Sequence, residues 1–387
     1  MIKVALSKNC QKLPPYIFLE IDRLKDEAIK RGADVIDLGV GDPDRPTPQR
    51  IIEAMKKAVE DPKNHRYPFG SGMLKLREKI AEYYRNSFKV ELNPQDEVIA
   101  LLGSKEGIAH IHPAFIDPSD VILVPEPGYP VYSNMTVMSS GTPYFMPLVK
   151  ENNFLPDIDS IPKTILKKVK LMWINYPNNP TSAIANEEFF KRIVAIADKY
   201  NIIVCHDAAY IDVGYDDYQP LSFLSIDGAK EVGIEFYSLS KTFNMTGWRI
   251  GFALGNREVI KGLGKVKANV DSGVFQAIQY AGLEALSFTR EEIKEIMCVY
   301  KDRRESFVPK LREMGWEIVD SKATFYVWAK IPSEISSMDM AKLILEKCSV
   351  IVTPGFGLGQ SGEKYIRIAL TVEKERLLEA AERLRKL

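Results

Sequence analysis

The sequence has few cysteines, no long apolar run and no excess of either charge. Its four cysteines lie far apart and form no C-x-x-C pair, which argues against a disulfide framework or a thiolate zinc site. No segment approaches the ~18 apolar residues of a membrane helix, and the apolar run at the start is too short for a signal peptide. The 52 basic and 52 acidic residues balance, so neither nucleic acid nor a membrane surface is indicated as a partner. We therefore expect a cytoplasmic protein that acts on small molecules.

The 387 residues, 45% of them hydrophobic, are enough to bury a large core. Short apolar runs alternate with amphipathic stretches, which is the βαβ rhythm of a largely parallel sheet. These runs are 35–38, 97–102, 121–125, 170–176, 202–207 and 235–240. Beyond about residue 270, charged helices and two strand-like runs, 323–330 and 364–370, indicate a smaller α+β lobe. The prediction is an α/β fold with an N-terminal arm that also contributes to the small domain (1–44), a large domain (45–280) and a small C-terminal domain (281–387).

The residues that follow the predicted strands are of types that commonly bind small ligands. Ligands of open parallel sheets bind beyond the carboxyl ends of the strands. Those positions hold GSKEG (103–107), EPGYPVY (126–132), PNNPTS (177–182), Asp207 with Tyr210, and Lys241. Taken singly, each has an ordinary structural explanation as a solvated side chain, a helix cap, a turn or core packing. Packing gives no reason for all of them to gather at one sheet edge, so together they predict a site.

Rival motifs are incomplete. Ser238 to Lys241 matches the S-x-x-K pattern of penicillin-recognising enzymes, but their S-D-N and K-T-G elements do not occur here. LGVG (38–41) continues into Asp42, which breaks a dinucleotide fingerprint, and the glycine-rich run 355–362 has no Walker lysine. His110 and His112 would project from different sides of a helix, which gives poor support to a metal site.

The run SLSKTFNMTGWRIG (238–251) resembles the pyridoxal phosphate (PLP) attachment signature of the class I/II aminotransferases of fold type I. The resemblance covers nearly the whole chain through LGVGDPDRPTP, RYPFGSG, GSKEG, PGYPVY, NYPNNPTS, DAAY and YIRIAL, in the family's order. LPPYIFLEIDR (13–23) and LGVGDPDRPTP (38–48), followed by KANVDSGVFQAIQ, are similar to the bacterial LL-diaminopimelate aminotransferase group. The fold implied is that of a fold type I PLP-dependent transferase.

The resemblance implies a role for each matching residue toward PLP. Lys241 forms the imine with the cofactor and then moves a proton at the substrate Cα, while Asp207 faces the pyridine nitrogen. Tyr210 and Asn179 bind the phenolic oxygen of the ring, and Tyr129 stacks on its face. The phosphate ligands implied are Arg249, Ser238, Ser240, Ser104, Lys105 and, across a homodimer interface, Tyr67.

The resemblance also implies how an amino acid is held. Arg367 grips the α-carboxylate as a fork, and Gly39 and Gly41 let the backbone approach it. Lys105 and Tyr16 are the candidates near a distal carboxylate, and the cofactor-binding residues Tyr129 and Asn179 also belong to the substrate-binding set. We expect closure of the two lobes to exclude water.

The reaction implied is transfer of an amino group between an amino acid and a 2-oxo acid, with LL-2,6-diaminopimelate and 2-oxoglutarate as the expected pair. KANVDSGVF (267–275) shows no arginine of the kind that aspartate-specific relatives use for the side-chain carboxylate. Aspartate, aromatic or alanine aminotransferases and PLP-dependent β-lyases or racemases remain alternatives. A PLP-fold transcriptional regulator is disfavoured because only about fifteen residues precede the fold.

Overall fold

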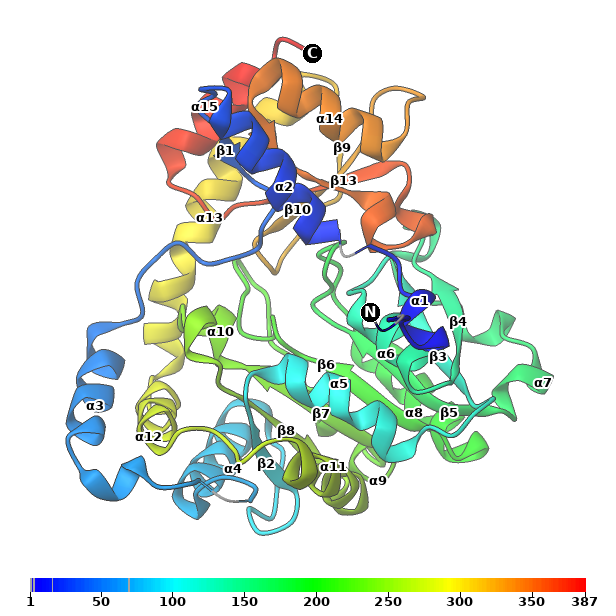
Figure 1. Cartoon of the computed structure of the whole chain (residues 1–387), viewed down its shortest axis with the longest axis vertical. Coiled ribbons are helices and arrows are strands. Elements are labelled where there is room, and N and C mark those ends of the chain that lie inside the picture. The colour runs from blue at the N-terminus through cyan, green and yellow to red at the C-terminus, as the bar shows by residue number, and fades with distance from the viewer. Residues whose placement is uncertain (1, 3, 16, 69) are drawn as a thin grey trace.

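The computed structural model describes residues 2, 4–15, 17–68 and 70–387, which form two lobes (Figure 1). Within this part of the chain, the larger lobe is built on a seven-stranded sheet of order β2-β8-β7-β6-β5-β3-β4. Its strands are β2 (Val98–Leu101), β3 (Val121–Glu126), β4 (Thr142–Pro147), β5 (Val169–Asn175), β6 (Ile203–Asp207), β7 (Gly233–Ser238) and β8 (Gly251–Gly255).

The strand directions bring the predicted site segments to one edge of this sheet. Strands β4, β3, β5, β6 and β7 pair in parallel, whereas β8 runs antiparallel to both β7 and β2. Two reversals leave β2 pointing the same way as the parallel strands. The carboxyl ends of β2, β3, β5, β6 and β7 therefore meet, and the prediction of a largely parallel sheet is confirmed.

Helices cover both faces of the sheet, which explains why its strands are apolar throughout. In β5, Leu171 and Trp173 join one core, whereas Met172 and Ile174 join the other. The first core includes residues of α5 (Ser104–Phe115), α6 (Val131–Met138) and α11 (Arg257–Val270), and the second includes residues of α4 (Leu74–Phe88), α8 (Glu187–Tyr200) and α12 (Gln276–Ala285). Because successive side chains alternate in direction, a strand covered on both faces needs apolar residues at every position.

The smaller lobe contains an antiparallel sheet of order β12-β13-β10-β9. Its strands are β9 (Glu317–Ile318), β10 (Tyr326–Lys330), β12 (Thr353–Pro354) and β13 (Tyr365–Ala369), and the helices of this part of the chain are α2 (Ile17–Lys30), α13 (Arg290–Glu313), α14 (Ser337–Cys348) and α15 (Lys374–Leu384). The domain boundaries at 44/45 and 280/281 stay a prediction.

One predicted strand has a different sheet partner, and two strands of the main sheet were missed. The run 35–38 was expected in the main sheet, but its strand β1 (Ile36–Asp37) pairs with β11 (Val350–Ile351) in the smaller lobe. An apolar run specifies burial without specifying a sheet partner. Strand β4 was missed because it is largely exposed, and β8 was missed because it begins at Gly251, the last residue of the signature run.

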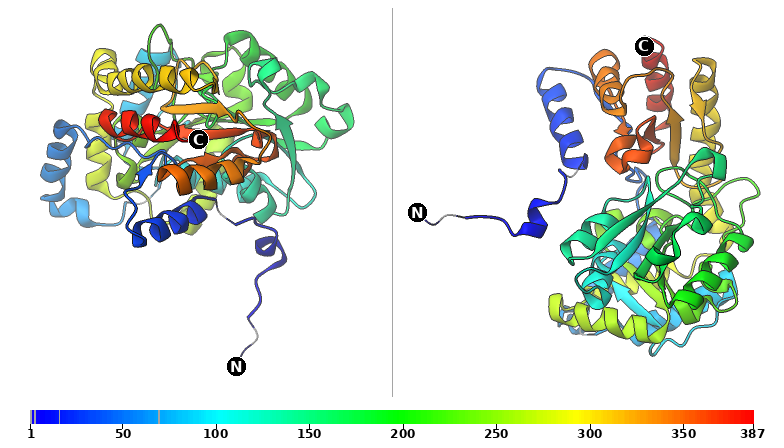
Figure 2. Two further views of the ribbon diagram at one scale, coloured as in Figure 1. Left: turned by 90° about the horizontal axis from the view of Figure 1, so that it is seen from above. Right: turned by 90° about the vertical axis from the view of Figure 1, so that its right-hand side faces the viewer.

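The remaining helices are short or peripheral: α1 (Lys8–Gln11), α3 (Gln49–Val59), α7 (Lys163–Leu166), α9 (Ala229–Val232) and α10 (Leu239–Thr242). The stretch before α1 projects from the body, and Ile2, Val4 and Leu6 are exposed (Figure 2). Among the residues the structure describes, we find no helix with the length and apolar character needed to cross a membrane.

A buried ion pair fixes the segment that leads from β1 toward the larger lobe. The guanidinium of Arg303, on the long helix α13, donates to both oxygens of Asp44 at 2.7 and 2.6 Å and to the Leu370 carbonyl at 3.0 Å. Arg303 is fully buried, whereas the Asp44 side chain is 20% exposed. Loss of the arginine would leave two acceptors without this donor in a site that water reaches poorly.

We predict that Arg303→Met lowers the free energy of unfolding by about 2 kcal/mol, measured by equilibrium urea denaturation. Arg385→Met is the matched control, because Arg385 is 43% exposed and pairs with Glu313 at the surface. The control should change stability by less than about 0.5 kcal/mol. Equal effects of the two substitutions would contradict the role assigned to the Arg303 pair.

Candidate active site

A cavity of about 320 Å³ opens at the carboxyl edge of the main sheet. Its size is in the range of small-ligand sites. Most of the residues predicted from the sequence line it: Gly41, Ser104, Lys105, Tyr129, Asn179, Asp207, Tyr210, Ser240, Lys241, Arg249 and Arg367. Segments far apart in the sequence thus meet in one place.

Lys241 presents its amine to this cavity from the short helix α10, which starts directly after β7. Its Nζ donates to the Gly41 carbonyl at 2.9 Å. Burial lowers the pKa of Lys241 to about 8, and the nearby Arg367 and Arg249 act in the same direction. A much larger fraction of this amine is neutral, and hence nucleophilic, at physiological pH than for an exposed lysine.

Asp207 lies at the end of β6 and is 5% exposed. Its Oδ2 accepts a hydrogen bond from the Tyr132 hydroxyl at 2.6 Å, and its Oδ1 accepts one from the Ala209 N–H at 3.3 Å. Burial raises the pKa of the Asp207 carboxyl, while the Tyr132 hydrogen bond opposes the rise. This carboxylate is poised to pair with a cationic ligand group, because such a group would offset its desolvation.

Tyr132 was missed by the sequence analysis and is held by a stack of aromatic rings. Its ring stacks on Trp173 with centroids 4.7 Å apart, and Trp173 stacks on His112 at 5.6 Å. Burial lowers the pKa of His112 to about 4, so this imidazole is neutral and accepts the Trp173 indole N–H. The stack fixes the tyrosine hydroxyl against Asp207.

Arg367, on β13, reaches the cavity from the smaller lobe and is 1% exposed. It donates to the Asn179 side chain at 2.9 Å and to the Gly39 carbonyl at 2.7 Å. Its guanidinium carbon lies 4.3 Å from the centroid of the Tyr326 ring. The Tyr326 hydroxyl lies 2.8 Å from the hydroxyl of Tyr210, whose pKa is raised well above its ordinary value mainly by burial.

The start of α5 lies beside Arg249 and has the geometry to bind an anion. Gly103 is the N-cap at φ +77°, followed by Ser104 and Lys105 on the cavity wall. Unbonded N–H groups at a helix start attract anions. Arg249 donates to the Thr246 and Leu102 carbonyls at 2.9 and 3.4 Å. A Cβ atom at residue 103 would overlap the Arg249 guanidinium, so a larger residue there would have to displace it.

Four predicted residues are not among the described residues that line the cavity. Ser238 is buried and accepts the Ser240 N–H, and Gly39 contributes the carbonyl that Arg367 binds. Tyr67 is 70% exposed. Tyr16 lies outside the described residues.

Several residues that line the cavity had no predicted role: Val40, Ile108, Tyr132, Asn175, Ala209, Thr246 and Tyr326. Most of them stand inside or beside quoted motifs, so proximity to a motif was the available signal. Asn175, for example, opens NYPNNPTS and donates to the Asp207 carbonyl at 2.7 Å. Tyr326 carried no signal beyond a predicted strand.

Comparison with known proteins agrees with this geometry. The family "Aminotransferase class I and II" matches residues 33–384, and the chain belongs to this family and is an aminotransferase. It is 52% identical to the LL-diaminopimelate aminotransferase of Halothermothrix orenii, covering 97% of this chain and 96% of that protein. It is also 52% identical to the LL-diaminopimelate aminotransferase of Aquifex aeolicus, covering 98% of each. The structure of substrate-bound BacF from Bacillus subtilis matches with a TM-score of 0.96 at 38% identity, covering 99% and 98%.

We predict that Gly103→Ala lowers kcat/KM for amino-group transfer at least about tenfold, because the new methyl group displaces Arg249 from the turn. Gly315→Ala is the control, since Gly315 has a similar φ of +84° but no atom within 4 Å of the added Cβ. Both variants should lose about 1 kcal/mol of stability through backbone strain. Retention of full activity by Gly103→Ala would show that the turn tolerates the overlap.

Proposed function

We propose that the protein is a PLP-dependent aminotransferase that moves an amino group from LL-2,6-diaminopimelate to 2-oxoglutarate. The observation that carries the proposal is the meeting of Lys241, Asp207 and Arg367 at one cavity. An amine, a carboxylate and a guanidinium suit the aldehyde of the cofactor, its ring nitrogen and the substrate carboxylate, respectively. The resemblance to the two bacterial LL-diaminopimelate aminotransferases supports the substrate.

The donor set fits PLP. When bound, this cofactor supplies an electron-poor ring that stabilises negative charge at the substrate Cα. Asp207 would hold the ring nitrogen in its protonated form, with Tyr132 fixing the orientation of the carboxylate. Tyr210 and Asn179 would hold the phenolic oxygen, and Tyr129 would pack on the ring face. Arg249, the turn 103–105, Ser238 and Ser240 would hold the phosphate.

Lys241 has two tasks in the proposed reaction. Its amine would hold the cofactor covalently, which the lowered pKa favours because it raises the neutral fraction. With an amino acid bound in its place, the same amine would move a proton at the substrate Cα. The adjoining Gly41 carbonyl, 2.9 Å from Nζ, holds the amine at the boundary between the lobes. Burial around it excludes the water that would otherwise compete for the proton.

Arg367 would bind the substrate α-carboxylate. Its planar fork matches a carboxylate better than the point charge of a lysine, and the Gly39 carbonyl and Tyr326 ring fix its plane. A diaminopimelate carries a second amino-acid group at its far end. Lys105, whose Nζ lies 5.9 Å from the centroid of the Tyr129 ring, and Tyr16 are proposed near the distal carboxylate.

We also propose that the protein is a cytoplasmic homodimer in which Tyr67 of one subunit completes the phosphate site of the other. Tyr67 is exposed in the single chain and lies in the RYPFGSG segment that gave the resemblance. An exposed aromatic residue at that position is consistent with a role at a subunit interface.

We predict that the rate of covalent attachment of PLP to the cofactor-free protein rises with pH and levels off above about 8. The neutral amine is the reactive form, and the pKa of Lys241 is about 8 instead of the ordinary 10.5. Stopped-flow absorbance would follow the attachment, with Lys241→Ala as the variant that should lose this phase. A rate that still increases steeply near pH 10 would contradict the lowered pKa.

The substrate is tested by comparing kcat/KM for LL-diaminopimelate, aspartate, phenylalanine and alanine with 2-oxoglutarate as acceptor. LL-Diaminopimelate should be preferred by up to about 10⁴-fold, because a site built for distal polar groups leaves them unpaired with a shorter substrate. Arg367→Lys is the control and should slow all four substrates alike, since it acts on the shared α-carboxylate. If any of the other three amino acids exceeds LL-diaminopimelate, the substrate assignment is wrong.

A further inference from the structure

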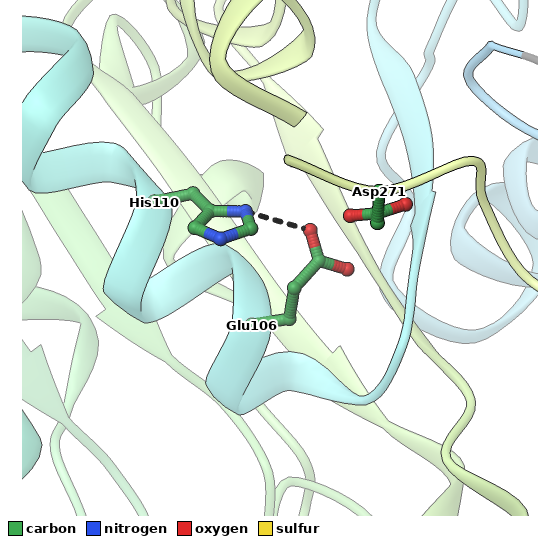
Figure 3. Close-up of side chains that lie close together, drawn as sticks. All are labelled: Glu106, His110 and Asp271. Atoms are coloured by element: carbon green, nitrogen blue, oxygen red, sulfur yellow. Dashed lines mark hydrogen bonds and ion pairs between the residues drawn. The ribbon is translucent and has the colours of Figure 1, made fainter. Parts of the chain in front are cut away.

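A cluster of ionisable side chains lies near the start of α5, and its members are not among the residues that line the cavity. Glu106 and His110 on α5 and Asp271 just beyond α11 place potential ligand atoms within 4.8 Å of one another (Figure 3). The ammonium of Lys267 forms ion pairs with both carboxylates, with its Nζ 3.0 Å from Glu106 Oε2 and 2.8 Å from Asp271 Oδ1. Because this lysine is 3% exposed, the cluster is a buried ion-pair group with its own cation.

One set of hydrogen bonds, which we call the Glu106 arm, connects the cluster to the cavity. The Oε2 atom of Glu106 that pairs with Lys267 also accepts the Leu102 N–H at 2.7 Å. The Leu102 carbonyl in turn accepts from Arg249 at 3.4 Å. Leu102 is therefore held on both sides immediately before Gly103. This arm fixes the anion-binding turn of the chain's own cavity.

The other arm leads to the segment that carries Tyr67. The Oδ1 atom of Asp271 that pairs with Lys267 also accepts the Gly273 N–H at 2.6 Å. Gly273 has φ +98° and packs so closely on the Pro68 carbonyl that a Cβ atom there would overlap it. Pro68 directly follows Tyr67. This arm therefore fixes the backbone on which Tyr67 is carried.

We propose that Lys267 is a positioning residue for two active sites at once. Through Glu106 it orders the phosphate turn of its own subunit, and through Asp271 it orders the Tyr67 segment that serves the partner subunit. The inference rests on the proposed function, in which Tyr67 crosses a homodimer interface. The inference adds that the two carboxylates, which share one ammonium, act on different active sites.

Heterodimers in which only one cavity is active separate the two arms. One subunit carries Lys241→Ala, so the active cavity uses the Lys241 and the phosphate turn of the other subunit and the Tyr67 of the Lys241→Ala subunit. Asp271→Asn or Glu106→Gln is then placed in either subunit, and the heterodimers are isolated with two affinity tags. The two placements of one substitution give assemblies of identical composition, which separates a site effect from a general loss of stability.

Asp271→Asn should raise the PLP dissociation constant of the active cavity about tenfold when it is in the Lys241→Ala subunit, and much less when it is in the active subunit. Glu106→Gln should show the reverse dependence. The readouts are PLP release and kcat/KM, with the melting temperature as a check on folding. Glu258→Gln is the matched control, because Glu258 lies on α11, is 72% exposed and should have no effect in either subunit.

Two outcomes overturn the inference and can be told apart. Tyr67→Phe should impair the active cavity only from the Lys241→Ala subunit. If Tyr67→Phe impairs the active cavity only when it is placed in the active subunit, the proposal of a shared site is wrong, and the inference that depends on it is wrong as well. If Tyr67→Phe behaves as expected but Asp271→Asn and Glu106→Gln act equally from both subunits, the shared site stands and the inference alone is overturned.

Discussion

The burial of charge at the carboxyl edge of the main sheet is the constraint on which the site depends. Lys241 is half-buried and Asp207 and Arg367 are buried, and a buried charge is costly unless a polar partner replaces the solvent. Each has one: the Gly41 carbonyl, the Tyr132 hydroxyl, and the pair of Asn179 and the Gly39 carbonyl. These partners come from the loop after β5, from α6 and from the segment after β1, so satisfying the charges requires the elements to assemble.

The segment 39–41 connects the two lobes at this point. Its carbonyls accept from Lys241 of the larger lobe and from Arg367 and Thr353 of the smaller one. The phenol of Tyr326 occupies the space where a side chain at residue 41 would lie. A movement of either lobe would therefore change the hydrogen bonds of Lys241, the proposed catalytic lysine, or of Arg367, the proposed carboxylate-binding residue. The lobe closure that the resemblance implies would act on Lys241 through the same few backbone atoms.

The sequence predicted the sheet edge well because a strand followed by an unusual polar residue is a local pattern. Lys241, Asp207 and the 103–105 turn were all found in this way. Contacts between distant segments were not predictable: Tyr129 was named from its motif, whereas Tyr132, three residues on, donates its hydroxyl to Asp207. The same limit explains why the run 35–38 was assigned to the wrong sheet, because its partner strand β11 lies more than three hundred residues away. Local patterns specify which residues become buried, whereas tertiary packing decides what each one touches.

Buried charges outside the cavity also have polar partners, as the cluster of Glu106, Asp271 and Lys267 shows. Glu106 and Asp271 share the ammonium of Lys267, and the other oxygen of Glu106 lies 2.9 Å from Nδ1 of His110. Two backbone donors, the Leu102 and Gly273 N–H groups, bind the same carboxylate oxygens that Lys267 binds. Such charge-assisted hydrogen bonds are strong and fix the donors in place. The two carboxylates thus tie the cluster to the main chain on both sides, and segments that looked like separate motifs in the sequence form one connected unit.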